Sequence, residues 1–165
     1  MPISRPAFAL ALLGSTLPAA QAQPTSPDIA ILSATDEVKL LCAGTLGSEQ
    51  LVSAYIAQAK SRPELHAFVT LDEEGGLKAA RPADAARRKG GAACKPLAGL
   101  PVVIKDNIQA KGLPATAGTP ALKDFVPTAD APVVARLRSA GAIVLGKTHM
   151  HELAFGVTGY NPAFQ

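Results

Sequence analysis

The sequence carries little excess charge of either sign. It has 16 Lys and Arg against 13 Asp and Glu, a formal net charge of +3. A balance this small predicts neither nucleic-acid binding nor attraction to a membrane surface. The one basic run, Arg87-Arg88-Lys89, falls at the end of a predicted helix, where cations complement the helix dipole. We interpret it as a solvated helix end rather than a polyanion site.

The sequence also lacks an apolar run long enough to span a membrane comfortably. Its short apolar stretch over residues 7–20 is interrupted by Gly14 and Pro18. Arg5 precedes this stretch and Ala20-Gln21-Ala22 follows it, a pattern typical of a secretory signal peptide. We therefore predict a signal peptide over residues 1–22 and a periplasmic or secreted product that leaves the membrane after cleavage.

Cysteine is scarce, and the spacing of Cys42 and Cys94 matches no zinc motif. In an oxidising compartment the two residues have the opportunity to form a disulfide. Cys42, however, lies on a predicted helix rich in buried-type residues, where a free cysteine behaves as a small hydrophobe. We favour free cysteines and leave the disulfide open.

Apolar periodicity and turn residues predict alternating helices and strands after a linker over residues 23–32. Strands are expected at residues 67–71, 100–104 and 142–145. Helices are expected at residues 33–44, 48–60, 76–89 and 130–140, with Ser33 and Asp130 as caps and a break at Pro82. Val133, Val134, Leu137 and Ala140 should form the inner face of the last helix. The alternation predicts an α/β fold with parallel pairing, and three strands are few for a self-sufficient sheet of this type.

Lys105 directly follows the second predicted strand, Leu100-Pro-Val-Val-Ile104. The carboxyl ends of strands are where active sites form in open α/β sheets. A lysine held in a dry pocket there loses its proton more easily, because burial disfavours the charged form. Spacing alone favours the simpler interpretation of a solvated lysine at a strand end.

The residues around Lys105 change that balance. Residues 96–107, Pro-Leu-Ala-Gly-Leu-Pro-Val-Val-Ile-Lys-Asp-Asn, resemble the opening signature of the amidase signature family, serine hydrolases with a Ser–cis-Ser–Lys triad. The likeness continues through residues 112–119, 130–141 and 146–156, and more weakly through 36–71. It implies a mixed, mostly parallel sheet flanked by helices, of which residues 33–165 form the N-terminal part.

The resemblance implies a role for each residue of this region. Lys105 becomes the triad lysine, which in neutral form accepts a proton from a bridging serine that activates the nucleophilic serine. Asp106 and Asn107 would orient the strand end or its loop, although simple loop capping is an equal alternative. Thr116, Gly118 and Thr119 resemble the family's small-residue loop and are assigned to the shape of the substrate pocket. No cofactor or metal is implied.

The family's two serines have no counterpart in this sequence, which contains no Ser-Ser pair and no Gly-x-Ser-x-Gly elbow. Beyond the linker the serines all lie on or cap predicted helices: Ser33, Ser48, Ser53, Ser61 and Ser139. The family's serine-bearing segment would begin shortly after Gln165. We therefore expect a truncated chain that is inactive alone.

His149 and His151 would face the same side of a strand, which raises the possibility of a metal site. The only adjacent further ligand, Glu152, would point to the opposite face, so we disfavour this interpretation. The family usually has Asn at the position of His149.

The sequence therefore predicts an exported amidase that hydrolyses a small-molecule amide. The alternative from another class is an inactive fragment or a non-catalytic binding remnant. Within the family, the amidotransferase subunit that acts on charged tRNA is a competitor. The signal segment argues against it, as does His151, where that subunit's pattern has Asp.

Overall fold

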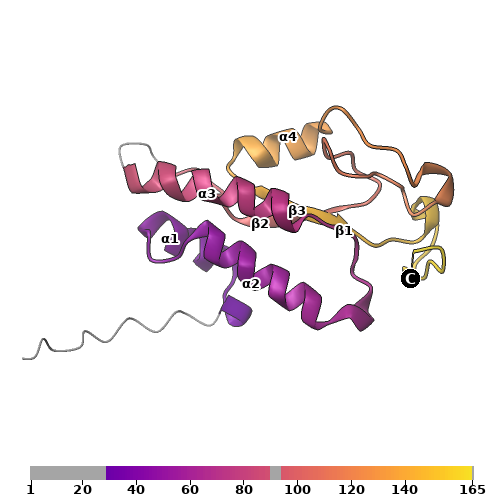
Figure 1. The fold of residues 1–165 in the computed structure, drawn as a ribbon, viewed down its shortest axis with the longest axis horizontal. Helices are drawn as coiled ribbons and strands as arrows, with labels where there is room; N and C mark the ends of the chain where they lie inside the picture. The colour runs from indigo at the N-terminus through magenta and orange to yellow at the C-terminus, as the bar shows by residue number, and fades with distance from the viewer. Residues whose placement is uncertain (1–28, 90–93, 165) are drawn as a thin grey trace, which may run out of the picture.

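The computed structural model describes residues 29–89 and 94–164 (Figure 1). The predicted signal peptide and most of the predicted linker lie outside the described residues. The described helices are α1 (Ala34–Ala43), α2 (Ser48–Ser61), α3 (Glu73–Lys89) and α4 (Pro132–Ser139), joined by the short 3-10 turns η1 (Ile29–Ile31), η2 (Pro63–Leu65), η3 (Pro120–Leu122) and η4 (Glu152–Ala154). The strands are β1 (Phe68–Leu71), β2 (Pro101–Lys105) and β3 (Ile143–Thr148).

The three strands form a mixed sheet in the order β1-β3-β2. The chain passes from β2 through α4 to β3, a crossover that makes this pair parallel, as expected. β1 instead runs antiparallel to β3, so the expected parallel pairing holds for one of the two ladders. Because β3 is central, five of its six residues are buried, whereas β2 has an open edge in the described chain.

Helices cover both faces of this sheet (Figure 1). On one face, α2 and α3 pack against β3 through a cluster of Val52, Ile56, Ala80, Ile143 and Leu145. On the other face, α4 and the preceding loop pack against β2 and β3 through Ile104, Ala110, Leu113, Val134 and Val144. A third cluster joins α1 and α2 to the start of β2 through Leu41, Leu46, Leu51 and Leu100. The predicted α/β fold is confirmed.

Capping explains where the first two helices begin. Ser33 accepts a hydrogen bond from the backbone N–H of Asp36 and caps α1, as predicted, and Gly44 ends it with a left-handed φ of 74°. α2 starts without a cap of its own, since Gly47 precedes it. Asp84 of α3 supplies the acceptors, at 2.7 Å from the N–H of Ser48 and 3.1 Å from that of Glu49.

This packing explains why the predicted break at Pro82 is wrong. α3 runs uninterrupted from Glu73 to Lys89, although a proline inside a helix costs one backbone hydrogen bond. Pro82 is exposed, whereas Ala80 and Asp84 on either side are buried against the rest of the molecule. Their burial stabilises the helix through the proline.

The predicted cap of α4 is also wrong. Its N-cap residue is Ala131, and Asp130 instead accepts a hydrogen bond from the backbone N–H of Lys111 at 2.7 Å. The same carboxylate lies 3.1 Å from Nε of Arg138. Val134 is buried as expected, but Val133 is 42% exposed and does not belong to the inner face.

The cysteines form a disulfide between Cys42 and Cys94, with their Cα atoms 5.7 Å apart. The expectation of free cysteines is therefore wrong. Cys42 follows the fully buried Leu41 but is itself exposed, so it is not part of the apolar face of α1. The bond fastens α1 to the segment that leads into β2.

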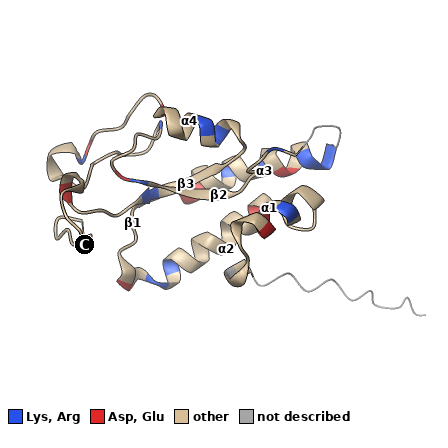
Figure 2. Cartoon of the chain, turned by 180° about the vertical axis from the view of Figure 1, so that it is seen from behind, with Lys and Arg blue, Asp and Glu red and all other residues tan. Residues whose placement is uncertain are grey.

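Charged residues are interspersed along the helices and loops of the described chain (Figure 2). Arg87, Arg88 and Lys89 form the last turn of α3, where they complement the helix dipole, as predicted. None of the helices in residues 29–89 and 94–164 combines the length and the apolar character that a membrane crossing requires.

Candidate active site at the carboxyl end of the sheet

Lys105 is the last residue of β2 and is exposed. Its Cα partner on β3 is Thr148, which in turn pairs with Phe68 of β1. The preceding Ile104 packs into the cluster on the α4 side, so alternation along the strand directs Lys105 to the opposite face. The structure therefore places the candidate lysine at the carboxyl end of a strand, as predicted, with its side chain open to solvent.

Asp106 differs sharply from its neighbour, since it is fully buried. Its backbone N–H donates to the carbonyl of Thr148 at 3.2 Å, which continues the β2–β3 pairing past Lys105. Its carboxylate accepts hydrogen bonds from the backbone N–H of Thr116 at 3.3 Å and of Gly118 at 3.2 Å, and from the hydroxyl of Thr116. Asp106 thus ties the end of β2 to the loop that contains residues 114–119.

This loop holds the three residues assigned to the pocket, and all three are buried: Thr116, Gly118 and Thr119. Between them, Ala117 adopts a left-handed backbone with φ of 50°, and its carbonyl accepts the N–H of Leu153 at 2.8 Å. Leu153 is left-handed too, with φ of 51°. Such strained residues cluster at functional sites, where the surroundings fix them.

Asn161 locks the two loops together from the other side. Its side-chain amide donates to the carbonyl of Gly118 at 2.6 Å and to that of Met150 at 3.2 Å. A Cβ atom at Gly118 would lie 2.8 Å from this amide nitrogen, so the close approach requires glycine. Sequence reasoning gave Asn161 no role.

Lys147 is the most unexpected member of the site, since its side chain is fully buried on β3. Its ammonium donates to the carbonyl of Pro114 at 3.0 Å, to the carbonyl of Asp106 at 3.3 Å and to the carboxylate of Asp106 at 3.2 Å. Burial lowers the pKa of Lys147 from its ordinary value, although the adjacent Asp106 carboxylate opposes this shift. The apolar run before Lys147 is the signal that could have indicated its burial.

Asn107 is exposed in the turn that follows β2. The turn is closed by the N–H of Ile108, which donates to the carbonyl of Lys105 at 2.9 Å. The structure therefore brings together Asp106, Thr116 and Gly118 around Lys147, while Lys105 and Asn107 face solvent on either side of Asp106.

The histidines do not lie on a strand, because β3 ends at Thr148. His149 contacts the carbonyl of Gly159 through Nε2 at 3.0 Å, while Nδ1 of His149 and of His151 are buried without a protein partner. Residues 29–89 and 94–164 contain no group of three or more His, Cys, Asp or Glu side chains arranged to hold a metal ion.

The serines of the described chain lie where the sequence placed them. Ser33 caps α1, and Ser48 and Ser61 are the first and last residues of α2. The hydroxyls of Ser53 and Ser139 bond to carbonyls within their own helices. The described part of the chain therefore offers Lys105 no serine in a loop or turn beside it.

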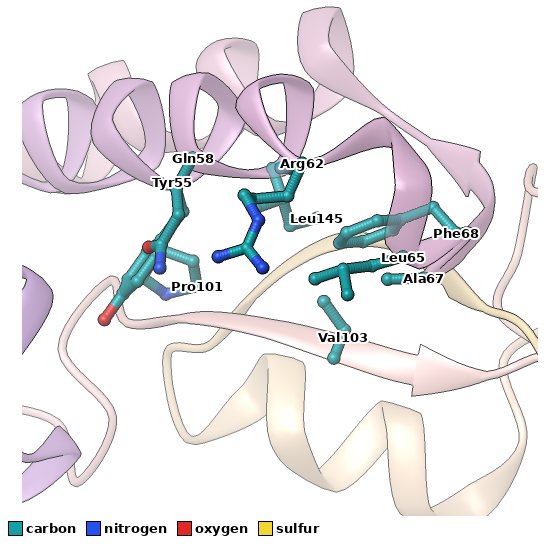
Figure 3. Close-up of a pocket in the computed structure, with 10 residues that line it drawn as sticks. Tyr55, Gln58, Arg62, Leu65, Ala67, Phe68, Pro101, Val103 and Leu145 are labelled. Carbon is teal, nitrogen blue, oxygen red and sulfur yellow. The ribbon is translucent and has the colours of Figure 1, made fainter.

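A cavity of about 350 Å³ lies between α2 and the sheet, on the face of β2 that carries Val103 (Figure 3). Figure 3 shows Arg62, at the end of α2, reaching into it towards β2. Its lining is mainly apolar: Tyr55, Gln58, Ala59, Arg62, Leu65, Ala67, Phe68, Pro101, Val103 and Leu145. The cavity adjoins the strand of Lys105 but is not lined by Lys105.

These features define an α/β protein with a lysine at the carboxyl end of a strand and a buried ionic network beside it. A model of the protein family described as Amidase matches residues 50–165. The chain therefore belongs to the amidase family, and the resemblance read from residues 96–107 is confirmed.

Known proteins with similar sequences are amide-processing enzymes by name. Mandelamide hydrolase from Pseudomonas putida is 46% identical over 133 residues, which cover 81% of this chain and 26% of that protein. A subunit of the glutamyl-tRNA(Gln) amidotransferase from Salinispora tropica is 39% identical over 138 residues, covering 83% and 28%. The chain thus spans about a quarter of the length of these relatives.

Solved structures show the same relation. The native peptide amidase of Stenotrophomonas maltophilia matches with a TM-score of 0.70 and 39% identity, over 76% of this chain and 26% of that one. A crystal structure described as an amidase matches with a TM-score of 0.74 and 37% identity, over 81% and 30%. The fold of the described chain is that of the corresponding part of these enzymes.

Proposed function

We propose that this chain supplies the lysine of a Ser–cis-Ser–Lys amide hydrolase and that further sequence of the same protein supplies the two serines. The observation that carries the proposal is the position of Lys105, at the carboxyl end of a strand in a chain of the amidase family. The buried anchor of Asp106, directly after it, fixes the backbone at this point.

In the proposed reaction, neutral Lys105 accepts a proton from the bridging serine, which accepts one from the nucleophilic serine. The serine oxygen attacks the amide carbonyl, and backbone N–H groups stabilise the oxyanion. Collapse of the tetrahedral intermediate releases ammonia or an amine and leaves an acyl-enzyme. Water then attacks the ester and releases the carboxylic acid. These steps involve no metal and no cofactor.

The neutral form of Lys105 sets a structural requirement on the whole enzyme. An exposed lysine keeps its proton at neutral pH, and only burial away from other acceptors disfavours the charge. Polypeptide must therefore cover the open edge of β2 and enclose the Lys105 amine beside the serine hydroxyl. The same requirement leads us to expect no turnover from residues 23–165 alone.

We further propose that the protein is exported, with a signal peptide over residues 1–22. The Cys42–Cys94 disulfide supports this proposal, because disulfides persist in oxidising compartments and are rare in the cytosol. N-terminal sequencing of the protein recovered from a periplasmic or culture fraction should give Gln23 as the first residue. A cytosolic protein that retains Met1 would contradict export without affecting the proposed chemistry.

The test of the activity uses the complete protein, meaning the longest reading frame that contains this sequence. Ammonia release is measured from mandelamide, from a peptide with a C-terminal amide and from a short aliphatic amide. Mandelamide is included because the relative named for it is 46% identical to this chain. We expect turnover of at least one amide in the wild type and its loss in Lys105→Ala.

Two results would favour the alternative of a non-catalytic remnant. One is a reading frame that contains no adjacent serines in a Gly-rich segment. The other is a folded complete protein that hydrolyses none of the three amides.

A further inference from the structure

The buried ammonium of Lys147 has an acceptor for each of its three N–H bonds. Two of the three belong to Asp106, its carbonyl at 3.3 Å and its carboxylate at 3.2 Å, and the third is the carbonyl of Pro114 at 3.0 Å. One side chain of the central strand thus holds both the end of β2 and the start of the loop that carries Thr116. Neither the sequence signature nor the proposed reaction uses this group.

The network fixes the backbone directly after Lys105. The N–H of Asp106 donates to Thr148 at 3.2 Å, and its carbonyl accepts from Lys147. Both polar groups of that residue's backbone are therefore bonded to β3, so the Cα of Lys105 has little freedom to move. A triad lysine needs such fixation, because a displacement of about 1 Å is enough to reduce a rate by about 10²-fold.

The geometry also excludes direct contact of Lys147 with the proposed reaction centre. Lys147 pairs with Ile104, whose side chain packs on the α4 side, whereas Lys105 pairs with Thr148. Residues opposite one another in a sheet share a face, so the two lysine side chains leave the sheet in opposite directions. Lys147 therefore has no access to the Lys105 amine or to a substrate bound beside it.

Stability alone does not account for a lysine at this position. Replacing a buried ion pair by apolar side chains of similar volume is often neutral or stabilising. A charged pair with five hydrogen bonds from three segments, β3, the end of β2 and the loop, has a strict geometry that an apolar pair lacks.

We propose that Lys147 is a positioning residue, which acts through Asp106 to set the place of Lys105 in the active site. The inference rests on the proposed function, because it gives the ion pair a consequence for turnover. It goes beyond that function by assigning a role to a lysine that never meets the substrate.

The experiment compares three variants of the complete protein with the wild type, on the best of the three amides. Lys147→Met keeps the chain length and removes the charge. Lys60→Met is the matched control, because Lys60 forms an exposed ion pair with Glu73. Lys105→Ala reports on the proposed function itself. For each variant kcat, KM and the midpoint of thermal unfolding are measured, with assays well below the lowest midpoint.

For Lys147→Met we expect kcat to fall by about 10²-fold with KM changed by less than about threefold, since substrate contacts remain and only the lysine is displaced. Lys60→Met should match the wild type in kcat and KM. A Lys147→Met variant with wild-type kcat would overturn the positioning role, while loss of activity in Lys105→Ala would still support the proposed function. Wild-type activity in Lys105→Ala would overturn both.

The double variant Lys147→Met/Asp106→Asn separates position from stability. Removing the uncompensated carboxylate should raise the unfolding midpoint above that of Lys147→Met, while kcat stays low because the backbone is still unclamped. Recovery of kcat together with the midpoint would assign Lys147 to folding alone. Failure of both the single and the double variant to fold would do the same.

Discussion

Two lysines stand at the ends of neighbouring parallel strands and have opposite surroundings. Lys105 ends the edge strand β2 and is exposed, whereas Lys147 lies one residue before the end of the central strand β3 and is fully buried. Position in the sheet accounts for the difference, because β3 has a neighbour on each side and β2 has one.

Burial and chemical availability are therefore separate properties of these two amines. Burial lowers the pKa of Lys147, which on its own would suggest a reactive amine. Each N–H of that amine is nevertheless committed to an acceptor, so it holds structure in place. Lys105 has no such commitment in the described chain, and its amine is available to a serine that approaches the strand end.

The largest effect should come from Lys105→Ala in the complete protein. Removal of a proton acceptor typically costs about 10²–10⁴-fold in rate, and we expect a loss of kcat in this range. The free energy of unfolding should change by less than about 0.5 kcal/mol, because the side chain is exposed at a strand end. Amide hydrolysis and urea unfolding are the two measurements. A large loss of stability with little loss of rate would reverse the roles of the two lysines.

The second prediction reverses the test at the buried end. Asp106→Ala leaves the Lys147 ammonium buried without a counter-charge, which should cost about 3–5 kcal/mol in urea unfolding. Because burial then lowers the pKa of Lys147 unopposed, the unfolded state binds more protons than the folded state. Stability should therefore rise as pH increases towards the ordinary lysine pKa.

The control for Asp106→Ala is Glu73→Ala, which removes the partner of the exposed Lys60. It should cost less than about 1 kcal/mol. Equal losses in the two variants would show that the buried pair has no special weight.

A third prediction concerns the opposite end of β2, where the Cys42–Cys94 disulfide joins α1 to the segment before the strand. Cys42→Ser/Cys94→Ser should lose about 2–4 kcal/mol of unfolding free energy, because a cross-link over 52 residues restricts the unfolded chain. Reductant should lower the urea midpoint of the wild type and leave that of the double variant unchanged. Hydrolysis by the folded variant should stay near wild type, since the bond is remote from the strand end.

The disulfide marks the limit of what the sequence could predict. Local patterns gave the strand and helix positions, the cap at Ser33 and the strand-end position of Lys105, since these depend on nearest neighbours in the chain. The pairing of Cys42 with Cys94 depends on contacts between segments 52 residues apart. The continuous α3 and the displaced role of Asp130 depend on partners that are likewise distant.

The candidate site divides in the same way. Residues 105–107 were found because they form a continuous motif after an apolar run. Lys147 and Asn161 were missed, because their importance comes from acceptors in other loops: Asp106 and Pro114 for the first, Gly118 and Met150 for the second. A single sequence gives no sign of these pairings before the chain is folded.

The smallest effect is expected at the loop that Lys147 and Asp106 hold. Gly118→Ala introduces a Cβ at φ of +68°, 2.8 Å from the amide nitrogen of Asn161 and 3.1 Å from the carbonyl of Met150. Left-handed strain and this overlap together should cost about 1–3 kcal/mol in urea unfolding. Gly112→Ala is the matched control, since Gly112 has φ of +81° but nothing within 4 Å of a Cβ.

The control carries the backbone strain alone, about 1 kcal/mol, so the difference between the two variants isolates the contact with Asn161. If that contact matters to the site, Gly118→Ala should also lower kcat, whereas Gly112→Ala should not. Equal losses of stability would mean that the loop yields to the new methyl group. The buried end of the sheet would then be less rigid than the network around Lys147 indicates.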